Sequence, residues 1–291
     1  MDNVINWLLE DETPEVKYRT MIELLGMSKD EPDVKKAYDR LLSSDTVSLV
    51  INKFKLNDKW EDVNAFCALA EFGLTRADVP IDDFIERTIK NMNYSVMKCA
   101  KILLLRNLVS LGYYEHAWVN EEITSAFSTI REYGTFRCLD KTKKTNDSKL
   151  PDRGCYRQTT TYLLLGAEMK KIGVILPQFE PLINFYINHY VAFRPEDPEK
   201  VIIKEMEGTF YPIDHVHMGL QMIMYGLSVL GAARHPNCEK ARALLDSNRD
   251  SEGKYVLSES FTEPYFNVGK VGKPNKWVTL YALLSEKFRV V

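Results

Sequence analysis

Apolar stretches that end in glycine recur along the chain. "MIELLG" ends at Gly26, "ALAEFG" at Gly73, "NLVSLG" at Gly112, "EMKKIG" at Gly173 and "LSVLG" at Gly231. Glycine most cheaply adopts the left-handed conformation that closes many helices. Each stretch therefore predicts a helix that stops at its glycine.

A second, more polar helix is expected after most of these glycines. The segments are "EPDVKKAYDRLL", "VPIDDFIERTIKN", "LPQFEPLINFYINHY" and "HPNCEKARALLDS". Each carries proline near its start, which suits the first helical turn because the missing N–H is not needed there. With the last helix, "NKWVTLYALLSEKF", six apolar helices are predicted, at about 14–26, 60–73, 93–112, 155–173, 214–231 and 275–288. Strand signals are nearly absent, so the fold class is all-α.

Repeated helical hairpins form either an open superhelix or a closed ring. An open solenoid keeps a near-constant repeat length, whereas the steps between these glycines are irregular. "KCAKILLLRNLVSLG" and "TTTYLLLGAEMKKIG" are apolar on more than one stripe, which suits an inner layer covered on both sides. The pattern therefore favours a closed α/α ring. The polar stretch 140–153 is either a lid over its mouth or a surface insertion.

Composition narrows the class of protein. The chain has 291 residues, 45% of them hydrophobic, and a net charge of −3, so no basic excess points to nucleic acid. It contains no run of 18 apolar residues, so we expect no transmembrane segment. Five cysteines are an odd number and argue against a disulfide scaffold, which makes a reducing cytoplasm the expected location.

Three stretches resemble a known family. "NRDSEGKYVL" resembles the Q-x(2–5)-G-x-W element of squalene–hopene cyclases, with Asn248 for glutamine and Tyr255 for tryptophan. "PEVKYRTMIELLG" at 14–26 and "VGKPNKWVTLYALLSEKFRV" at 271–290 resemble the two ends of small bacterial prenyltransferase-like or squalene-cyclase-like proteins. The resemblance covers nearly the whole chain. It implies a single (α/α)6-type toroid over residues 1–291, with a central cavity in which members of the terpenoid cyclase superfamily handle isoprenoid substrates.

Two catalytic motifs of that family are missing. Protonating cyclases carry an Asp-x-Asp-Asp acid, whereas "DD" at 82–83 has no third carboxylate at the right spacing. Protein prenyltransferases bind zinc through an Asp-x-Cys pair and a distant histidine, and no Asp-x-Cys occurs. Neither activity transfers residue by residue, so the sequence leaves open whether the protein is an enzyme.

The direction of the predicted helices suggests where a ligand binds. If the inner helices all end in glycine on one face, their N-termini surround a mouth on the opposite face. Helix N-termini carry partial positive charge and free N–H groups, so this mouth favours an anionic head group such as diphosphate or carboxylate. Capping alone also makes helix starts polar. The expected ligand-binding residues are Trp60, Tyr94, Arg153, Tyr156, Arg157, Tyr211 and Trp277.

Two residues near this mouth are candidates for catalysis. Asp214 is the only obvious acid, and after Pro212 it is also a natural N-cap of the helix expected from 214. Cys155 is a candidate nucleophile, because a helix N-terminus between Arg153 and Arg157 lowers the pKa of a thiol.

A zinc site is a further hypothesis. Cys138, Cys155, His215 and His217 have the right chemistry, since thiolate and imidazole are good zinc ligands. On a helix, however, the two histidines point about 200° apart and cannot both bind one ion. Buried cysteines without a metal are the competing interpretation.

Several functions fit this combination. The first is an enzyme that acts on a small apolar, isoprenoid-like molecule with an anionic head. The second is a non-catalytic protein of the same fold that binds such a ligand or a peptide. A carbohydrate-active six-hairpin enzyme is less favoured, because it needs paired carboxylates. A scaffold of the solenoid type would need an open superhelix.

Overall fold

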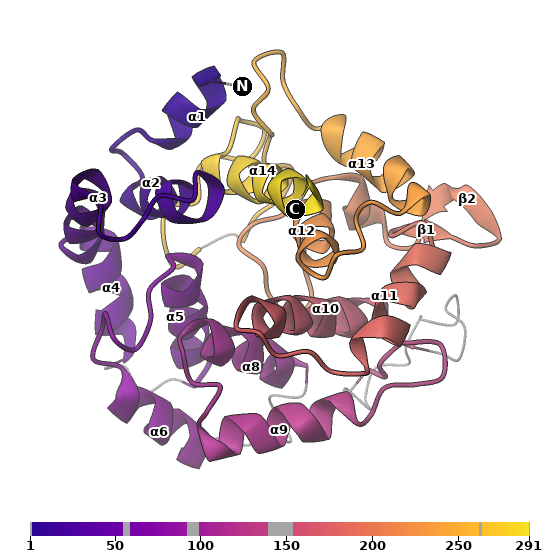
Figure 1. The fold of residues 1–291 in the computed structure, drawn as a ribbon, viewed down its shortest axis with the longest axis horizontal. Coiled ribbons are helices and arrows are strands. Elements are labelled where there is room, and N and C mark those ends of the chain that lie inside the picture. The colour runs from indigo at the N-terminus through magenta and orange to yellow at the C-terminus, as the bar shows by residue number, and fades with distance from the viewer. Residues whose placement is uncertain (1, 55–58, 92–98, 139–153, 262–263, 291) are drawn as a thin grey trace.

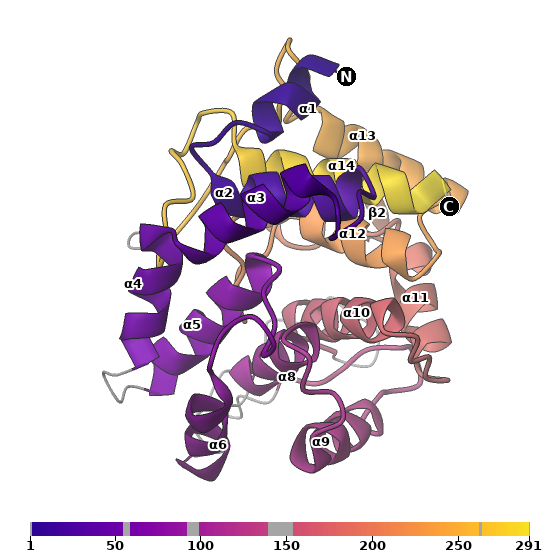
Figure 2. The ribbon, with the colours of Figure 1, turned by 60° about the vertical axis from the view of Figure 1, so that its left-hand side comes forward.

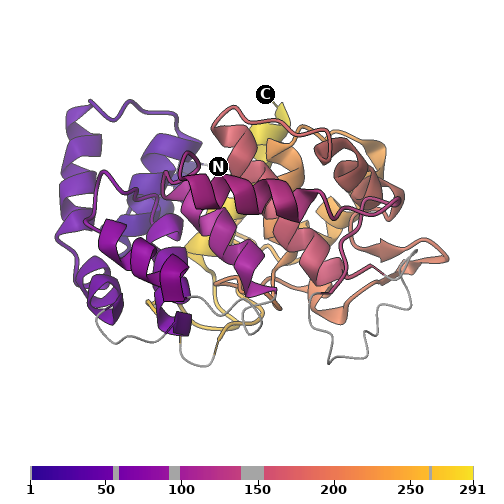
Figure 3. The same cartoon turned by 90° about the horizontal axis from the view of Figure 1, so that it is seen from below.

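The protein is mainly α-helical. A computed structural model describes residues 2–54, 59–91, 99–138, 154–261 and 264–290. Seen down its shortest axis, it has helices at the periphery and helices nearer the middle (Figure 1). The peripheral helices are α3 (Pro32–Leu42), α4 (Asp45–Lys53), α6 (Asp82–Asn91), α9 (Ala117–Phe127), α11 (Phe179–Asn188) and α13 (Glu239–Asp246). Figure 3 shows from below how α9, in magenta, lies in front of the inner helices.

The inner helices correspond to the apolar stretches of the sequence. They are α2 (Pro14–Arg19) with the π-helical turn η1 (Thr20–Leu24), α5 (Lys59–Glu71), α8 (Ala100–Ser110), α10 (Tyr156–Lys171), α12 (Leu220–Val229) and α14 (Lys276–Val290). Each packs on the next in the order α5, α8, α10, α12, α14, and α14 packs in turn on α2 and η1. Figure 2 shows α14 passing behind α2 and α3, with the short helix α1 (Asp2–Leu8) nearby. The last inner helix therefore lies against the first.

The glycine stops are confirmed. Gly26, Gly73, Gly112, Gly173 and Gly231 have positive φ angles of 71°, 75°, 89°, 82° and 86°. Buried apolar residues from all of the inner helices and all six peripheral helices form one continuous cluster, which runs from Leu8 to Leu284.

The predicted start of the fifth inner helix was wrong. The helix was expected from residue 214, but α12 begins at Leu220 after Gly219. Asp214 does accept hydrogen bonds from the backbone N–H groups of Val216 and His217, two and three residues on. These bonds close a turn in an irregular segment, because a short carboxylate offers the backbone an alternative to a helix.

A small antiparallel sheet was not anticipated. Strands β1 (Phe193–Arg194) and β2 (Asp197–Val201) form a hairpin after α11, followed by the 3-10 turn η5 (Lys204–Glu207). A second 3-10 turn, η6 (Pro236–Cys238), leads into α13. The sequence pattern does not predict this hairpin, because "DPEKV" contains proline and only one β-branched residue.

The segment with the resemblance to the cyclase motif joins α13 to α14. Tyr255 is buried, and its hydroxyl donates to Asp246 and accepts from Arg249, both at 2.6 Å. Its backbone N–H donates to Thr279 Oγ1 at 2.9 Å, and its carbonyl accepts from Asn275 N–H at 2.8 Å. The aromatic residue thus fixes the turn after the outer helix to the first turns of the last inner helix.

Candidate functional site

A buried carboxylate lies at the centre of the inner layer. Glu71, at the end of α5, has no exposed surface. Its Oε1 accepts from Arg106 Nη1 at 2.6 Å, and its Oε2 accepts from the hydroxyls of Tyr281 at 2.5 Å and Tyr211 at 3.0 Å. Arg19 Nη1 lies 3.8 Å from the same Oε2 and donates to the Tyr281 hydroxyl at 2.9 Å. Residues of five inner segments therefore meet at one group.

The ion pairs continue into a closed circuit. Arg106 Nη2 is 3.7 Å from Glu168, Glu168 is 3.1 Å from Lys171, and Lys171 is 3.7 Å from Glu23. Glu23 closes the circuit through Arg19, whose Nε and Nη2 bind its two oxygens at 2.5 and 3.0 Å. Three cations and three carboxylates thus alternate. We call this set the charge ring: Arg19, Glu23, Glu71, Arg106, Glu168 and Lys171.

Local structure positions the ring at the glycine ends of the inner helices. Arg19 directly precedes the π-helical turn and Glu23 lies within it; at its end, Leu25 N–H donates to Thr20 C=O five residues earlier. Such turns widen a helix locally and are frequent at functional sites. Lys171 lies in the last turn of α10, where a cation opposes the partial negative charge of the helix C-terminus.

Charges that are buried and paired in this way stay ionised near neutral pH. Burial favours a higher pKa for the Glu71 carboxyl, but Arg106, Arg19 and the hydrogen bond from Tyr281 outweigh it and lower this pKa. For Glu23 burial is likewise outweighed, by Arg19 and Lys171, and the pKa falls to about 2. Lys171 has a side chain that is 32% exposed; desolvation lowers its pKa, but Glu168, with Tyr225 and Glu23, outweighs this effect and raises the pKa well above its usual value. Burial raises the pKa of the Tyr281 and Tyr211 hydroxyls, so both remain protonated donors.

The charge ring borders a cavity of about 270 Å³ that opens between the ends of α5, α8, α10 and η1. A water molecule occupies about 30 Å³ in the liquid, so the space exceeds that of one or two waters. Five ring members line it, Glu71 lying behind them, and Tyr281 contributes a further wall. The remaining lining residues are Ile22, Lys29, Ala70, Gly73, Thr75, Val109, Ser110 and Ile172. We call this space the ring cavity.

One buried donor of the charge ring, the Nε–H of Arg106, has no acceptor among the described residues. Arg106 has a side chain that is 3% exposed, and its Nη1 is used by Glu71 and by Asn107. Its Nε is buried and makes no hydrogen bond to the described residues, and Nη2 reaches Glu168 only at 3.7 Å. Arg19 offers the contrast, because the equivalent edge of its guanidinium is filled by Glu23.

None of the predicted ligand-binding residues whose side chains the structure describes lines this cavity, although Tyr211 donates to Glu71 behind it. The described side chains of Tyr156, Tyr211 and Trp277 are almost fully buried. Tyr156 donates to Val191 C=O at 2.8 Å, and Tyr211 stacks on Trp277 with ring centroids 5.1 Å apart. Arg157 binds Glu205 at 2.7 Å. Tyr94 and the whole loop 140–153, with Arg153, lie outside the described residues, as does the side chain of Trp60.

The predicted zinc ligands are not brought together. Among the described residues, which include all four of them, no group of three or more His, Cys, Asp or Glu side chains could hold a metal ion. His215 and His217 lie in the irregular segment before α12, and His217 instead places its Nδ1 3.0 Å from Asp214 Oδ2. Cys155 is the residue before α10, as expected, and neither it nor Cys138 is in a disulfide.

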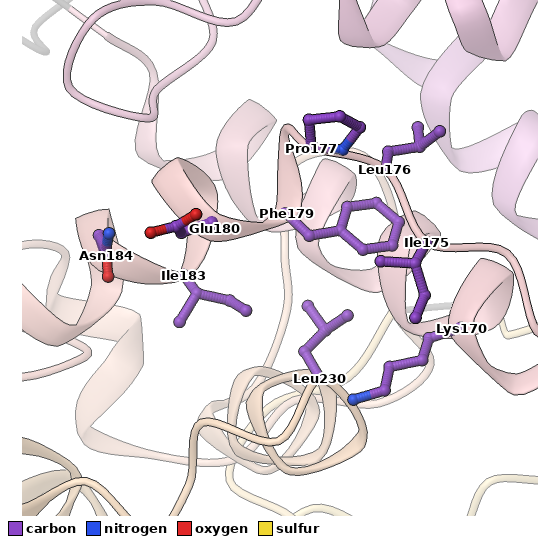
Figure 4. Close-up of a pocket in the computed structure, with 9 residues that line it drawn as sticks. All are labelled: Lys170, Ile175, Leu176, Pro177, Phe179, Glu180, Ile183, Asn184 and Leu230. Atoms are coloured by element: carbon purple, nitrogen blue, oxygen red, sulfur yellow. The ribbon is translucent and has the colours of Figure 1, made fainter.

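A second cavity lies on the outside of the molecule. It measures about 500 Å³ and is formed by the loop after α10, by α11 and by the end of α12. Figure 4 shows Phe179, Ile183 and Leu230 turned toward it, with Lys170 at one edge and Asn184 at another. Its wall is mainly apolar, and Ile175 is 71% exposed. It lacks the converging polar groups of the ring cavity, which is therefore the better candidate for a specific site.

The ring residues were missed because attention fell on the N-terminal ends of the inner helices. A signal was present: Glu71, Arg106 and Glu168 are charged residues inside otherwise apolar helices, in "CALAEFG", "LLLRNLVSLG" and "LLLGAEMKKIG". Charged residues are almost never fully buried unless they are paired. Opposite charges on separate apolar helices therefore predict that those helices meet.

Comparison with known proteins identifies no relative of this chain. No family model, curated protein or solved structure matches the chain. Of the helices that the structure describes, none combines the length and apolar content needed to cross a bilayer.

Proposed function

We propose that the protein is a non-catalytic α/α toroid that binds a small polar molecule in its ring cavity. The observation that carries the proposal is the cavity itself, bordered by five charged side chains that ion pairs hold in place. Inner-helix contacts run from α5 round to α14 and α2, and Arg19 of α2 donates to the Glu71 carbonyl of α5 at 3.1 Å, which supports the toroid.

The chemistry of the ring favours binding over proton transfer. A general acid or base works best with a pKa near the operating pH. The pKa values of Glu23 and Glu71 are lowered and that of Lys171 is raised, so these groups hold their charge instead of exchanging protons. The isoprenoid-type reaction implied by the family resemblance has no acid here to begin it.

Native mass spectrometry of the purified protein, set against its denatured mass, tests this function. We expect an additional organic mass in the native protein that is absent after denaturation. The variant Ala70→Met, which extends a lining residue of the ring cavity, should lose that mass. Equal native and denatured masses, with no thermal stabilisation by a panel of small polar metabolites, would contradict a binding function. A mass of one zinc would instead revive the metal hypothesis.

A further inference from the structure

The second cavity, which we call the outer cavity, is part of an apolar surface that water can reach. Phe179, Ile183 and Leu230 turn toward it. Ile175 also lines it and is 71% exposed, the largest exposed fraction among the large hydrophobic side chains of the described residues. A single exposed apolar residue is ordinary, but one beside an apolar cavity extends a contiguous surface, and such surfaces mark interaction sites.

Two further exposed side chains extend this surface. Ile172 is 48% exposed, three residues before Ile175, and Tyr133 is 53% exposed. Tyr133 precedes Gly134, which lies against the start of α11, since an added Cβ would fall 1.9 Å from the carbonyl oxygen of Pro181. The exposed apolar side chains therefore reach beyond the cavity, over an area better matched to a protein surface than to a small ligand.

The outer cavity carries opposite charges at its two ends. Figure 4 shows Lys170 and Ile175 on one side, and Glu180 and Asn184 on the other. Lys170 and Glu180 both line the cavity, and neither makes an ion pair with the described residues. The cavity is therefore neutral as a whole, with one positive and one negative end. A membrane surface, which attracts clusters of basic residues, is a poor match for it.

An arrangement of this kind is complementary to a second copy of itself. A two-fold axis that runs along the surface between the two ends exchanges them, so the positive end of one copy faces the negative end of the other. The same rotation turns the Ile175 side of each copy toward the Ile183 side of its partner. We propose that the outer cavity is the interface of a two-fold symmetric dimer, in which Ile175 packs into the partner's cavity and Lys170 pairs with Glu180 of the partner subunit. This dimer does not depend on ligand binding in the ring cavity.

Analytical ultracentrifugation of the full chain tests the dimer. We expect the mean mass of the native protein to rise from that of one chain toward twice that value between about 1 and 200 µM, the range of a weak specific dimer. Ile175→Ser should weaken the dimer at least about tenfold, because both copies lose a buried apolar contact. The side chain is exposed in the single chain, so the variant should keep the native melting temperature.

Leu49→Ser is the matched control. Leu49 is 52% exposed and belongs to α4, which lies on the opposite side of the molecule from α11 (Figure 1). Its replacement removes a similar exposed apolar side chain far from the outer cavity. The dissociation constant of the dimer should therefore stay within about twofold of the native value.

Charge reversal tests the two-fold arrangement. Lys170→Glu brings like charges together at both ends of the interface, and Glu180→Lys does the same. Each variant alone should therefore dimerise at least about threefold more weakly than the native protein. An equimolar mixture of the two variants restores opposite charges at both contacts, so its affinity should return to within about twofold of the native value. An interface in which these two residues do not meet gives no such recovery.

Four results would overturn the dimer or its geometry. A native protein that stays monomeric at about 200 µM lacks this interface. A dimer that Ile175→Ser leaves intact, or that Leu49→Ser weakens equally, is formed by another surface. Charge variants that have no effect, or that do not recover in the mixture, exclude the pairing of Lys170 with Glu180. A monomer that co-purifies with an apolar compound, and loses it in Ile175→Ser, would assign the outer cavity to a small ligand.

Discussion

At the scale of single residues, Glu71 is the group on which most interactions depend. It bonds to two arginines and two tyrosines, and all of these partners are buried. Replacing both sides of such a pair by apolar groups is often tolerated, whereas removing one side leaves a charge unpaired. The charge ring therefore favours one arrangement of the inner helices, and the loss of any one of its partners destabilises that arrangement.

Glu71→Gln should lower the free energy of unfolding by about 3–5 kcal/mol, because Arg19 and Arg106 lose their shared anion. Urea unfolding followed by circular dichroism measures this change. Glu252→Gln is the control: Glu252 lies on an exposed turn and pairs only with Lys254, so its loss should cost no more than about 0.5 kcal/mol. Equal effects of the two substitutions would show that Glu71 is not held as described.

The ring also predicts how stability depends on pH. Glu23 has a folded pKa of about 2 against an ordinary value of 4.5, so the unfolded chain binds its proton first. The stabilisation is present above about pH 4.5 and is lost as the pH falls toward 2. It amounts to about 3 kcal/mol for this carboxyl. Urea midpoints at pH 7, 4 and 3 should fall steadily, and Glu23→Gln should flatten part of that slope. If the urea midpoint of Glu23→Gln falls with pH as steeply as that of the native protein, Glu23 does not contribute to the pH dependence of stability.

At the scale of helices, the sequence predicted more than at the scale of residues. Glycine stops located the ends of five inner helices, because positive φ is a local property of the chain. The start of α12 was predicted too early because Asp214 closes a local turn. Helix propensity alone does not show whether such a residue forms a turn or begins a helix. The pairing of Arg106 with Glu71 depends on how α5 and α8 pack, which no single stretch contains.

Substitutions at two glycines with similar φ angles distinguish the cost of the left-handed backbone conformation from the cost of a steric clash. Gly134 and Gly173 have φ angles of 78° and 82°. A Cβ on Gly173 meets nothing within 4 Å, whereas on Gly134 it falls 1.9 Å from the carbonyl oxygen of Pro181 in α11. Gly173→Ala should therefore lower the free energy of unfolding by only about 1–2 kcal/mol, because the left-handed conformation is the sole obstacle to the alanine side chain. Gly134→Ala must also displace α11 from the loop after α9. Its loss of stability in the same urea assay should be at least about twice as large, and equal losses would exclude that contact.

At the scale of the whole molecule, the contact between the first and last inner helices distinguishes a ring from an arc. Residues of α14 reach η1 directly: Lys287 Nζ donates to Glu23 C=O at 2.7 Å, and Tyr281 accepts from Arg19. An open superhelix keeps its two ends apart, since each repeat contacts only its neighbours. The wall of the ring cavity includes Arg19 near the start of the chain and Tyr281 near its end, so this wall is complete only where the first and last inner helices meet.

Small-angle X-ray scattering tests closure directly. A compact chain of 291 residues has an expected radius of gyration of about 19 Å. We expect this value for the native protein extrapolated to infinite dilution, with a single symmetric peak in the distribution of interatomic distances. The variant Lys287→Ala removes one bond between the ends and leaves the buried pairing of Arg19 with Tyr281, so its radius should be unchanged. A clearly larger radius with an extended tail in the native protein would indicate an arc. The ring cavity, and with it the proposed binding function, would then lose its structural basis.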